Sequence, residues 1–164
     1  MQDNTVGSRS NTNLAYIAGF LDGDGSLMLQ LKKRKDGKSK MRFMCTICLY
    51  QDSRHEKPLN WMRKVLNIGY VSRRSDGISE LRINGYEQVK KILTLLTPFI
   101  RFKKIQARAM LSAANLLTKN FRKQLTDSEL RKMVEFMITI QNSNYVTKAK
   151  RSREELLSVL GLTP

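Results

Sequence analysis

The first periodic pattern along the chain is helical and begins at Asn13, after a polar stretch over residues 1–12 that has no periodicity. The apolar positions that recur at helical spacing are Leu14, Ile17, Ala18 and Leu21. This spacing predicts a helix with one buried side, ended by the glycines at 23 and 25. We expect residues 1–12 to be flexible because they carry no apolar face that packs.

The period then changes from 3.6 to 2, which is typical of strands. Leu27, Leu29 and Leu31 share one face of a strand over residues 26–32. A second alternating run directs Phe43, Cys45, Ile47 and Leu49 to the same side. The basic segment between them holds an Asp36-Gly37 turn signal, so the pair is predicted to be a β-hairpin.

The remaining pattern predicts a helix opening at Pro58, a hairpin over 69–74 and 78–83, and a helix over 89–96 that stops before Pro98. Three further helices are predicted around 107–117, after a Thr126–Glu129 capping box, and over 156–160 before Gly161. The fold class is therefore α+β. The element order is αββαββα over about 13–100, with C-terminal helices over about 103–161. It predicts a four-stranded antiparallel sheet with helices on one face, in a single domain over 13–164.

The charge of the chain narrows its possible partners. Its 164 residues include 30 Lys+Arg against 14 Asp+Glu, a formal net charge of +16. The sequence pI is about 10.2. A folded chain this basic favours a polyanion, with nucleic acid first and an anionic membrane a distant second. No apolar run approaches the ~18 residues of a membrane span, so we expect no membrane partner.

Cysteine usage and the N-terminus both indicate an intracellular protein, in a prokaryotic cytoplasm or an organelle. The N-terminus lacks the basic-then-apolar layout of an export signal. Two cysteines cannot form a disulfide framework. Their C-x-x-C spacing lies in a predicted strand, where residues three apart point to opposite faces, so we place Cys45 in the core and Cys48 on the exposed face. No P-loop or G-x-G-x-x-G is present, so we expect no nucleotide cofactor.

The sheet face opposite the leucines, with its hairpin loops, is predicted to bind duplex DNA. Arg and Gln contact guanine and adenine edges, Glu accepts from cytosine, and Lys contacts phosphates. Any solvent-facing strand is polar, yet this face is unusually poor in acids and has few aromatics for stacking RNA bases. The candidate DNA-binding residues are Ser26, Met28, Gln30, Lys32, Arg34, Lys38, Lys40, Arg42, Met44, Thr46, Cys48, Ser72, Arg74, Glu80 and Arg82, with Lys148 from a basic C-terminal connector.

Asp22 and Asp24 lie at the predicted C-terminus of the first helix, where the helix dipole disfavours a carboxylate. They diverge by about 200°, so within one chain they do not chelate one cation together. Small residues at Ala15, Gly19 and Gly23 give this helix a smooth stripe for close approach to the same helix of a second subunit. The predicted dimer interface is Ala15, Ala18, Gly19, Asp22 and Gly23. A two-fold axis there would pair two Asp24 carboxylates, which calls for a divalent cation such as Mg²⁺.

The segment Ile17-Ala-Gly-Phe-Leu-Asp-Gly-Asp-Gly25 resembles the LAGLIDADG motif of homing endonucleases, with five of nine letters identical. The resemblance extends over roughly residues 13–110 and is greatest to the single-motif, homodimeric, intron-encoded members. It implies that Asp24, with the Gly23 carbonyl beside it, binds the divalent metal (Mg²⁺ or Mn²⁺) at the scissile phosphates. It also implies a water-positioning residue at Gln51 and an active-site lysine at Lys103, with Arg101 as the alternative.

The resemblance further implies a basic residue four positions after Gln51. This chain has His55 there, where the family more often has Arg or Lys, and the adjacent Arg54 is the alternative. The predicted function is thus a site-specific double-strand endonuclease that leaves 3′ overhangs. Strands of about eight residues span ~26 Å, about eight base pairs per subunit, so the site approaches twenty pairs and is pseudo-palindromic. The alternatives are an RNA-binding intron maturase and a DNA-binding protein that does not cleave.

Overall fold

The computed structural model describes residues 9–35, 40–144 and 150–164. Its elements follow the predicted αββαββα order with added C-terminal helices. They are α1 (Asn11–Asp24), β1 (Gly25–Lys33), β2 (Met41–Asp52), η1 (Ser53–His55), α2 (Lys57–Leu66), β3 (Tyr70–Arg73), β4 (Ile78–Asn84), α3 (Tyr86–Leu96), α4 (Lys104–Lys119), α5 (Asp127–Ser143) and α6 (Arg153–Val159). The predicted α+β class is confirmed.

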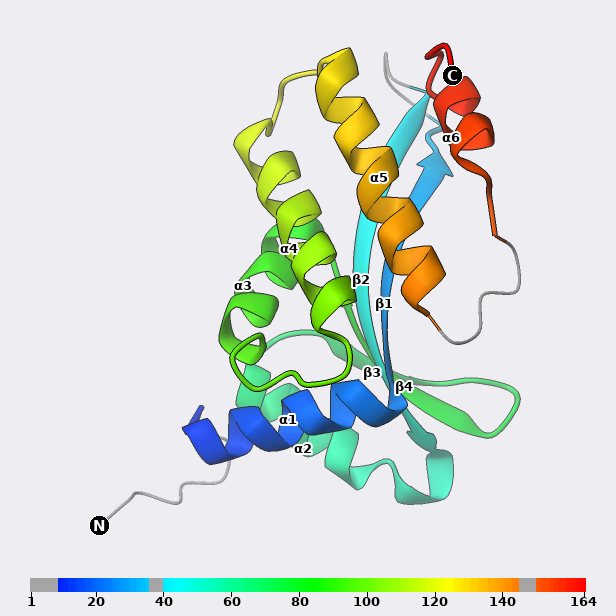
Figure 1. Ribbon diagram of the computed structural model, residues 1–164. Helices are drawn as coiled ribbons and strands as arrows, with labels where there is room; N and C mark the ends of the chain where they lie inside the picture. Colours follow the sequence, from blue (N-terminus) through cyan, green and yellow to red (C-terminus); the bar gives the residue numbers. More distant parts are fainter. Residues whose placement is uncertain (1–8, 36–39, 145–149) are drawn as a thin grey trace.

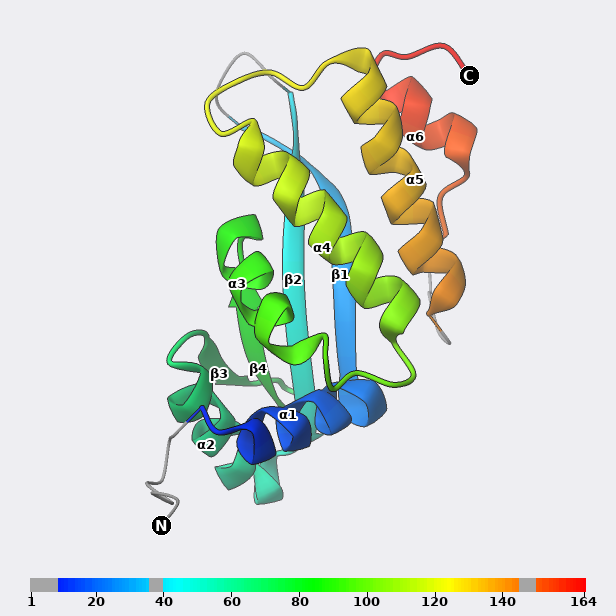
Figure 2. The same ribbon diagram turned by 60° about the vertical axis from the view of Figure 1, so that its left-hand side comes forward.

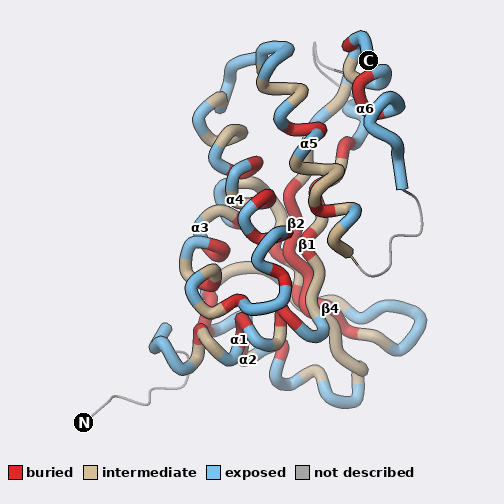
Figure 3. The backbone as a smooth tube through the Cα atoms, viewed as in Figure 1, coloured by how far each residue is buried: buried red, intermediate tan, exposed pale blue. Residues whose placement is uncertain are grey.

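The four strands form one antiparallel sheet in the order β1-β2-β4-β3. Helices α3, α4 and α5 cover one face of it, and α1 crosses its lower end (Figures 1 and 2). The covering helices meet the leucine face, where Leu27 on β1 aligns with Ile47 on β2 and Ile83 on β4. All three are buried, and Figure 3 shows the buried residues concentrated between the helices and the sheet. The predicted inward face of the sheet is therefore confirmed.

Helix α1 begins two residues earlier than predicted, at Asn11, because Ser10 caps it by accepting a hydrogen bond from the Asn13 N–H. Residues 11 and 12 are therefore helical, and their assignment to a flexible segment was wrong. At its other end α1 passes into β1 without a loop. A Cβ on Gly25 would lie only 2.8 Å from the Leu21 backbone, so this close turn requires glycine.

Helix α5 begins at its predicted cap, whereas the cap that opens α6 was not predicted. Thr126 and Glu129 form the capping box that opens α5, and a second box, Ser152 with Glu155, opens α6. Helix α6 packs with α5 against the far end of β1 through a small apolar cluster that includes Leu31, Val134 and Leu156. The Asp36-Gly37 turn lies outside the described residues, although Arg34 N–H donates to the Lys40 carbonyl at its base. No helix in the described ranges is long and apolar enough to cross a membrane.

Candidate active site

Asp22 lies on the inner side of α1, where it holds the loop before α4. Its carboxylate accepts hydrogen bonds from the backbone N–H groups of Arg101 at 2.6 Å, Phe102 at 3.2 Å and Lys103 at 2.9 Å. The side chain is only 8% exposed. These three bonds join segments about eighty residues apart in sequence and fix the loop against the end of α1.

The same loop places Lys103 against the C-terminal end of α1, next to Asp22. Its side chain is buried, and its ammonium donates a hydrogen bond to the Asp22 backbone carbonyl. This carbonyl is one of the last four of α1, which helix geometry leaves without a partner inside the helix. Burial lowers the pKa of Lys103, while the nearby Asp22 and Asp24 carboxylates act in the opposite direction. Arg101, the alternative from sequence, is exposed and contributes its backbone N–H instead. Lys103 is thus the cation held beside both aspartates.

Asp24 differs from Asp22 in exposure and in hydrogen bonding. It is exposed, and within the described ranges nothing donates a hydrogen bond to its carboxylate. An open groove of about 700 Å³ passes this end of α1, lined by Gly23, Ser26, Tyr50 and Lys103 among others. Over the described residues there is no cluster of three or more His, Cys, Asp or Glu side chains that could hold a metal ion. At this end of α1 the described residues therefore offer one carboxylate without a hydrogen bond, and a hard divalent cation fits it only with oxygen ligands from elsewhere.

Sheet register brings Gln51 close to Asp24 along the strands. Gly25, the first residue of β1, pairs with Leu49, so the chain just before β1 lies level with the end of β2. Gln51 is half-buried there, and its amide oxygen accepts a hydrogen bond from the Asp52 N–H at 2.8 Å. The predicted water-positioning residue is therefore at the same end of the sheet as the carboxylate.

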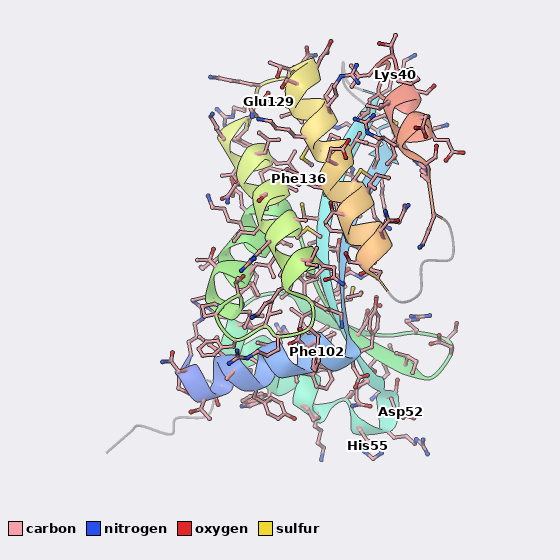
Figure 4. The ribbon with its side chains drawn as sticks, in the orientation of Figure 1. Lys40, Asp52, His55, Phe102, Glu129 and Phe136 are labelled. Carbon is pink, nitrogen blue, oxygen red and sulfur yellow. The ribbon has the colours of Figure 1, made fainter. Side chains whose placement is uncertain are left out.

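His55 ends the short helix η1 that follows β2, and its side chain is exposed (Figure 4). Asp52 caps η1 by accepting from the Arg54 N–H at 2.8 Å. The same carboxylate binds the Arg54 guanidinium at 2.8 and 3.0 Å, which lowers the pKa of Asp52. Of the two basic candidates, Arg54 is thus hydrogen-bonded to Asp52, whereas the exposed His55 side chain has no hydrogen bond within the described residues.

Most predicted DNA-binding residues do line the uncovered face of the sheet or its hairpin. Cross-strand pairs place them in rows, with Lys32 beside Arg42, Gln30 beside Met44, and Ser26 beside Cys48. The exposed members among them are Lys32, Arg34, Lys40, Arg42 and Arg74. Lys38 and Lys148 lie outside the described residues. The basic character of the face is therefore carried by β1, β2 and the hairpin ends.

Three residues predicted on this face are buried, which corrects the prediction of an exposed position for each. Thr46 donates its hydroxyl to the Asn84 side chain at 2.9 Å. Glu80 is paired with the Arg82 guanidinium at 2.9 Å. Cys48 is fully buried beside Arg82 in the same row, and burial raises the pKa of its thiol. Alternation gave the correct face, but neighbouring side chains cover these central positions.

Two tyrosines on the same face were missed. Tyr50 shares a hydrogen bond with Ser26 across the strands, with 3.0 Å between the hydroxyl oxygens. Tyr70 on β3 is half exposed and pairs with Arg82 in register. Continuing the alternation two residues beyond Cys48 would have found Tyr50. The face is therefore less poor in aromatic residues than the sequence argument assumed.

The sequence profile of the LAGLIDADG endonucleases matches residues 17–109, more than half of the chain. The chain belongs to this family. Within the LAGLIDADG fold, the motif helix is α1 and its last aspartate is the exposed Asp24.

Two LAGLIDADG relatives are similar over the same region. DNA endonuclease I-CvuI of Chlorella vulgaris is 31% identical over 97 residues, which cover 59% of this chain and 60% of the relative. DNA endonuclease I-CreI of Chlamydomonas reinhardtii is 32% identical over 98 residues, 60% of each protein. The match thus spans about 60% of the length of these relatives.

The likeness of structure extends further than that of sequence. The homing endonuclease I-CvuI, in complex with its target in the presence of Ca, has a TM-score of 0.79 and 25% identity over 93% of this chain and 97% of that chain. I-SmaMI, bound to cleaved DNA, has a TM-score of 0.71 and 20% identity, and 94% of this chain matches 49% of that chain. This fold therefore corresponds to about half of the I-SmaMI chain.

The LAGLIDADG helix leaves its small residues partly uncovered. A Cβ on Gly19 or Gly23 would meet no atom within 4 Å, and Ala15 is half-buried. Ala18 and Asp22 instead face the interior and are buried, so their assignment to a dimer interface was wrong. Tyr16 on the outer side is 56% exposed and packs edge-on against Trp61. Phe102, 79% exposed, lies beside the end of the same helix (Figure 4).

Proposed function

We propose that this protein is a site-specific endonuclease that hydrolyses both strands of duplex DNA with a divalent cation. One observation carries the proposal: the exposed Asp24 carboxylate, which accepts no hydrogen bond from the described residues, lies beside the buried ammonium of Lys103 at the end of a basic sheet face. Such a site suits an anionic substrate: the ammonium can contact the anion, and the carboxylate can share a bound cation with it. The phosphodiester backbone of DNA is an anion of this kind.

The sheet face supports duplex DNA as the substrate. Its uncovered side presents exposed Lys and Arg side chains at the ends of β1, β2 and the β3–β4 hairpin. The nine residues of β1 extend about 30 Å at ~3.3 Å each, the length of about nine base pairs. Two such faces cover a site of about twenty base pairs, and a symmetric dimer would make that site pseudo-palindromic.

A second copy of the chain is the proposed partner at α1. Glycines at 19 and 23 are not required by contacts with the described residues, and the exposed Tyr16 and Phe102 flank them. Close approach of another helix accounts for both features. A homodimer would also bring a second Asp24 to the site, which supplies the missing carboxylate. The match of this chain to half of I-SmaMI is consistent with a site built from two such units.

In this mechanism, Asp24 and the Gly23 carbonyl would hold the divalent cation, Mg²⁺ or Mn²⁺. When bound, such a cation polarises the phosphate, lowers the pKa of water and stabilises the leaving 3′ oxygen. Lys103 supplies a positive charge already desolvated and oriented by Asp22, so it stabilises charge on the phosphate with little reorganisation. Gln51 orients water through its amide, and His55 contacts the phosphate from η1.

The direct test is selection of cleaved sites from a random duplex library with Mg²⁺, followed by cleavage of the selected site. Recovery of one pseudo-palindromic site of about twenty base pairs with 3′ overhangs is expected. Binding of the library with no cleavage in Mg²⁺ or Mn²⁺ would overturn the proposed activity and favour a DNA-binding protein that does not cleave.

Tyr70 gives one specific reason to test RNA as well. It is half exposed on the same face and offers a ring on which an unpaired base can stack. Competition between the selected duplex and structured intron RNA separates the two substrates. Preference for RNA would favour the maturase function in place of the nuclease.

A further inference from the structure

Glu56 connects the segment that carries His55 to the β3–β4 hairpin. Its carboxylate accepts two hydrogen bonds from the Arg73 guanidinium on β3, at 2.9 and 2.7 Å. It also accepts the Ser79 hydroxyl of β4 at 2.6 Å. Both strands of the hairpin thus donate to one carboxylate, in a bidentate geometry that fixes orientation as well as distance.

Ser79 extends this junction to η1 and to Gln51. Its side chain is buried, and its hydroxyl lies 2.9 Å from the Ser53 hydroxyl at the start of η1. Ser53 also donates its N–H to the Gly77 carbonyl at 2.9 Å. In the β2–β4 register, Ser79 is the direct partner of Gln51. The residues between Gln51 and Glu56 are therefore held against the hairpin from both ends.

Glu56 does not serve α2 in the usual way of a residue at that position. It is the N-cap of α2, yet its side chain makes no capping hydrogen bond to the helix. Its two oxygens are directed to Arg73 and Ser79 instead, although the side chain of Arg73 is 69% exposed. The other ion pair of this segment, Asp52 with Arg54, joins residues two apart and ties η1 only to itself.

We propose that Glu56 is a positioning residue for the proposed cleavage reaction: by holding Arg73 and Ser79 it fixes the Gln51–Glu56 segment, and with it His55, relative to the DNA-contacting hairpin. The inference rests on the proposed function. It assigns Glu56 no contact with DNA or with the reacting atoms. Its role is to set the geometry in which Gln51 and His55 meet a phosphate that Ser72, Arg74 and Arg82 help to align.

The test compares Glu56→Gln with wild type on the selected DNA site. Glutamine keeps the size of the side chain and the bond to Ser79 but loses the charge and the bidentate pairing with Arg73. We expect the single-turnover cleavage rate to fall about 10- to 100-fold, as small displacements of catalytic groups do. DNA affinity measured without divalent cation should change less than about twofold, because no DNA contact is removed.

Two further variants separate positioning from general weakening. Glu135→Gln makes the same change in the remote Glu135–Arg153 ion pair and should leave the cleavage rate unchanged. The exchanged pair Glu56→Arg with Arg73→Glu restores the bridge with reversed charge and should recover most of the lost rate. A rescue of this kind is not expected if either single change acts by removing a DNA contact.

Hydrogen exchange gives a readout that does not depend on cleavage. In Glu56→Gln the Ser53 and His55 amides should exchange faster, with the α3 and α4 amides unchanged. Unchanged exchange, an unchanged cleavage rate, or a rate loss matched by an equal loss of binding or folding would each overturn the inference. If the two proteins show the expected difference in exchange but wild type cleaves no DNA, the proposed function is overturned and the contacts of Glu56 with Arg73 and Ser79 still hold the segment.

Discussion

The two aspartates at the end of α1 lie two residues apart and have opposite environments. Asp22 is buried and accepts three backbone N–H groups from the loop before α4. Asp24 is exposed and accepts none from the described part of the chain. A step of two residues turns about 200° around a helix, so one carboxylate enters the chain while the other leaves it. The comparison separates a structural acid from the proposed metal ligand on the same turn.

The energies of the two sites also differ in sign. Hydrogen bonds to a charged group contribute about 1.5–3 kcal/mol each, so Asp22 contributes substantially to folding. Asp24 gains no such bonds and lies at the negative end of the helix dipole, at a cost of about 0.3–1 kcal/mol. A carboxylate that carries this cost and accepts no hydrogen bond from the described residues is explained by a partner outside the chain.

Asp24→Asn should have the largest effect on activity of any single change in this comparison. We expect double-strand cleavage to fall about a thousandfold or more, because the transition-state stabilisation lost with a metal ligand is several kcal/mol. The free energy of unfolding should be unchanged or rise by up to about 1 kcal/mol, since the side chain accepts no hydrogen bond from the described residues and its charge opposes the helix dipole. Cleavage assays and urea unfolding of the same preparation test both; native-rate cleavage would disprove the role of Asp24.

Asp22→Asn should have the reverse profile. The amide retains one acceptor, but its NH₂ group faces backbone N–H donors, so buried donors lose their partner. Each costs about 1–3 kcal/mol, and we expect a loss of about 2–3 kcal/mol in the free energy of unfolding. Urea midpoints with an unchanged m-value would measure it. Full stability in this variant would show that the loop before α4 is held by other contacts.

Gly19→Leu sharpens the comparison on the outer side of α1. The chain itself has room for the side chain, so folding should be unaffected or slightly favoured, since glycine is a poor helix former. The proposed dimer should weaken by about 1–3 kcal/mol through overpacking. That is roughly a ten- to hundredfold increase in the dimer dissociation constant. Sedimentation of this variant and of Ser112→Leu, an exposed change on α4, provides the measurement and its control; equal dissociation constants would contradict the interface.

The smallest expected effect is the pH dependence of the stability that Glu56 contributes through its bonds to Arg73 and Ser79. Hydrogen bonds from Arg73 and Ser79 lower the pKa of Glu56 to about 2. A carboxyl group whose folded pKa is depressed contributes stability that is complete above its ordinary pKa of 4.5 and is lost as the pH falls through about 2. The difference in unfolding free energy between wild type and Glu56→Gln should therefore be constant near neutrality and shrink toward acid. A difference that grows as the pH falls would contradict the pairing.

The order of elements and the inward faces of the strands follow from sequence because they depend on local periodicity. Leu27, Leu29 and Leu31 alternate cleanly and all three are buried on the helix-covered side. The capping box at Thr126 is likewise set by residues three apart, and it is present. Resemblance to a motif added Asp24 and Lys103, which lie about eighty residues apart and share no local pattern.

What the sequence did not reveal depends on contacts between distant segments. Thr46 and Cys48 belong to the polar face by alternation, yet they lie on a central strand where neighbours on both sides cover them. Ala18 is a different case, because its helical spacing with Leu14 and Leu21 already predicted the buried side of α1, and its assignment to the dimer interface conflicted with that local pattern. The contacts of Glu56 with Arg73 and Ser79 form only when η1 packs against the hairpin. The spacing of these residues in the sequence does not predict them.

The most direct test of the account is cleavage by mixed subunits. Wild-type and Asp24→Asn chains, co-expressed in equal amounts and assayed with the selected site in excess, form random dimers if α1 is the interface. When both Asp24 carboxylates are needed, only wild-type dimers cut both strands, so double-strand cleavage should fall to about one quarter of that of the same total amount of wild type. A fall to about one half would mean that each chain cleaves alone, and would contradict a site completed by a second copy.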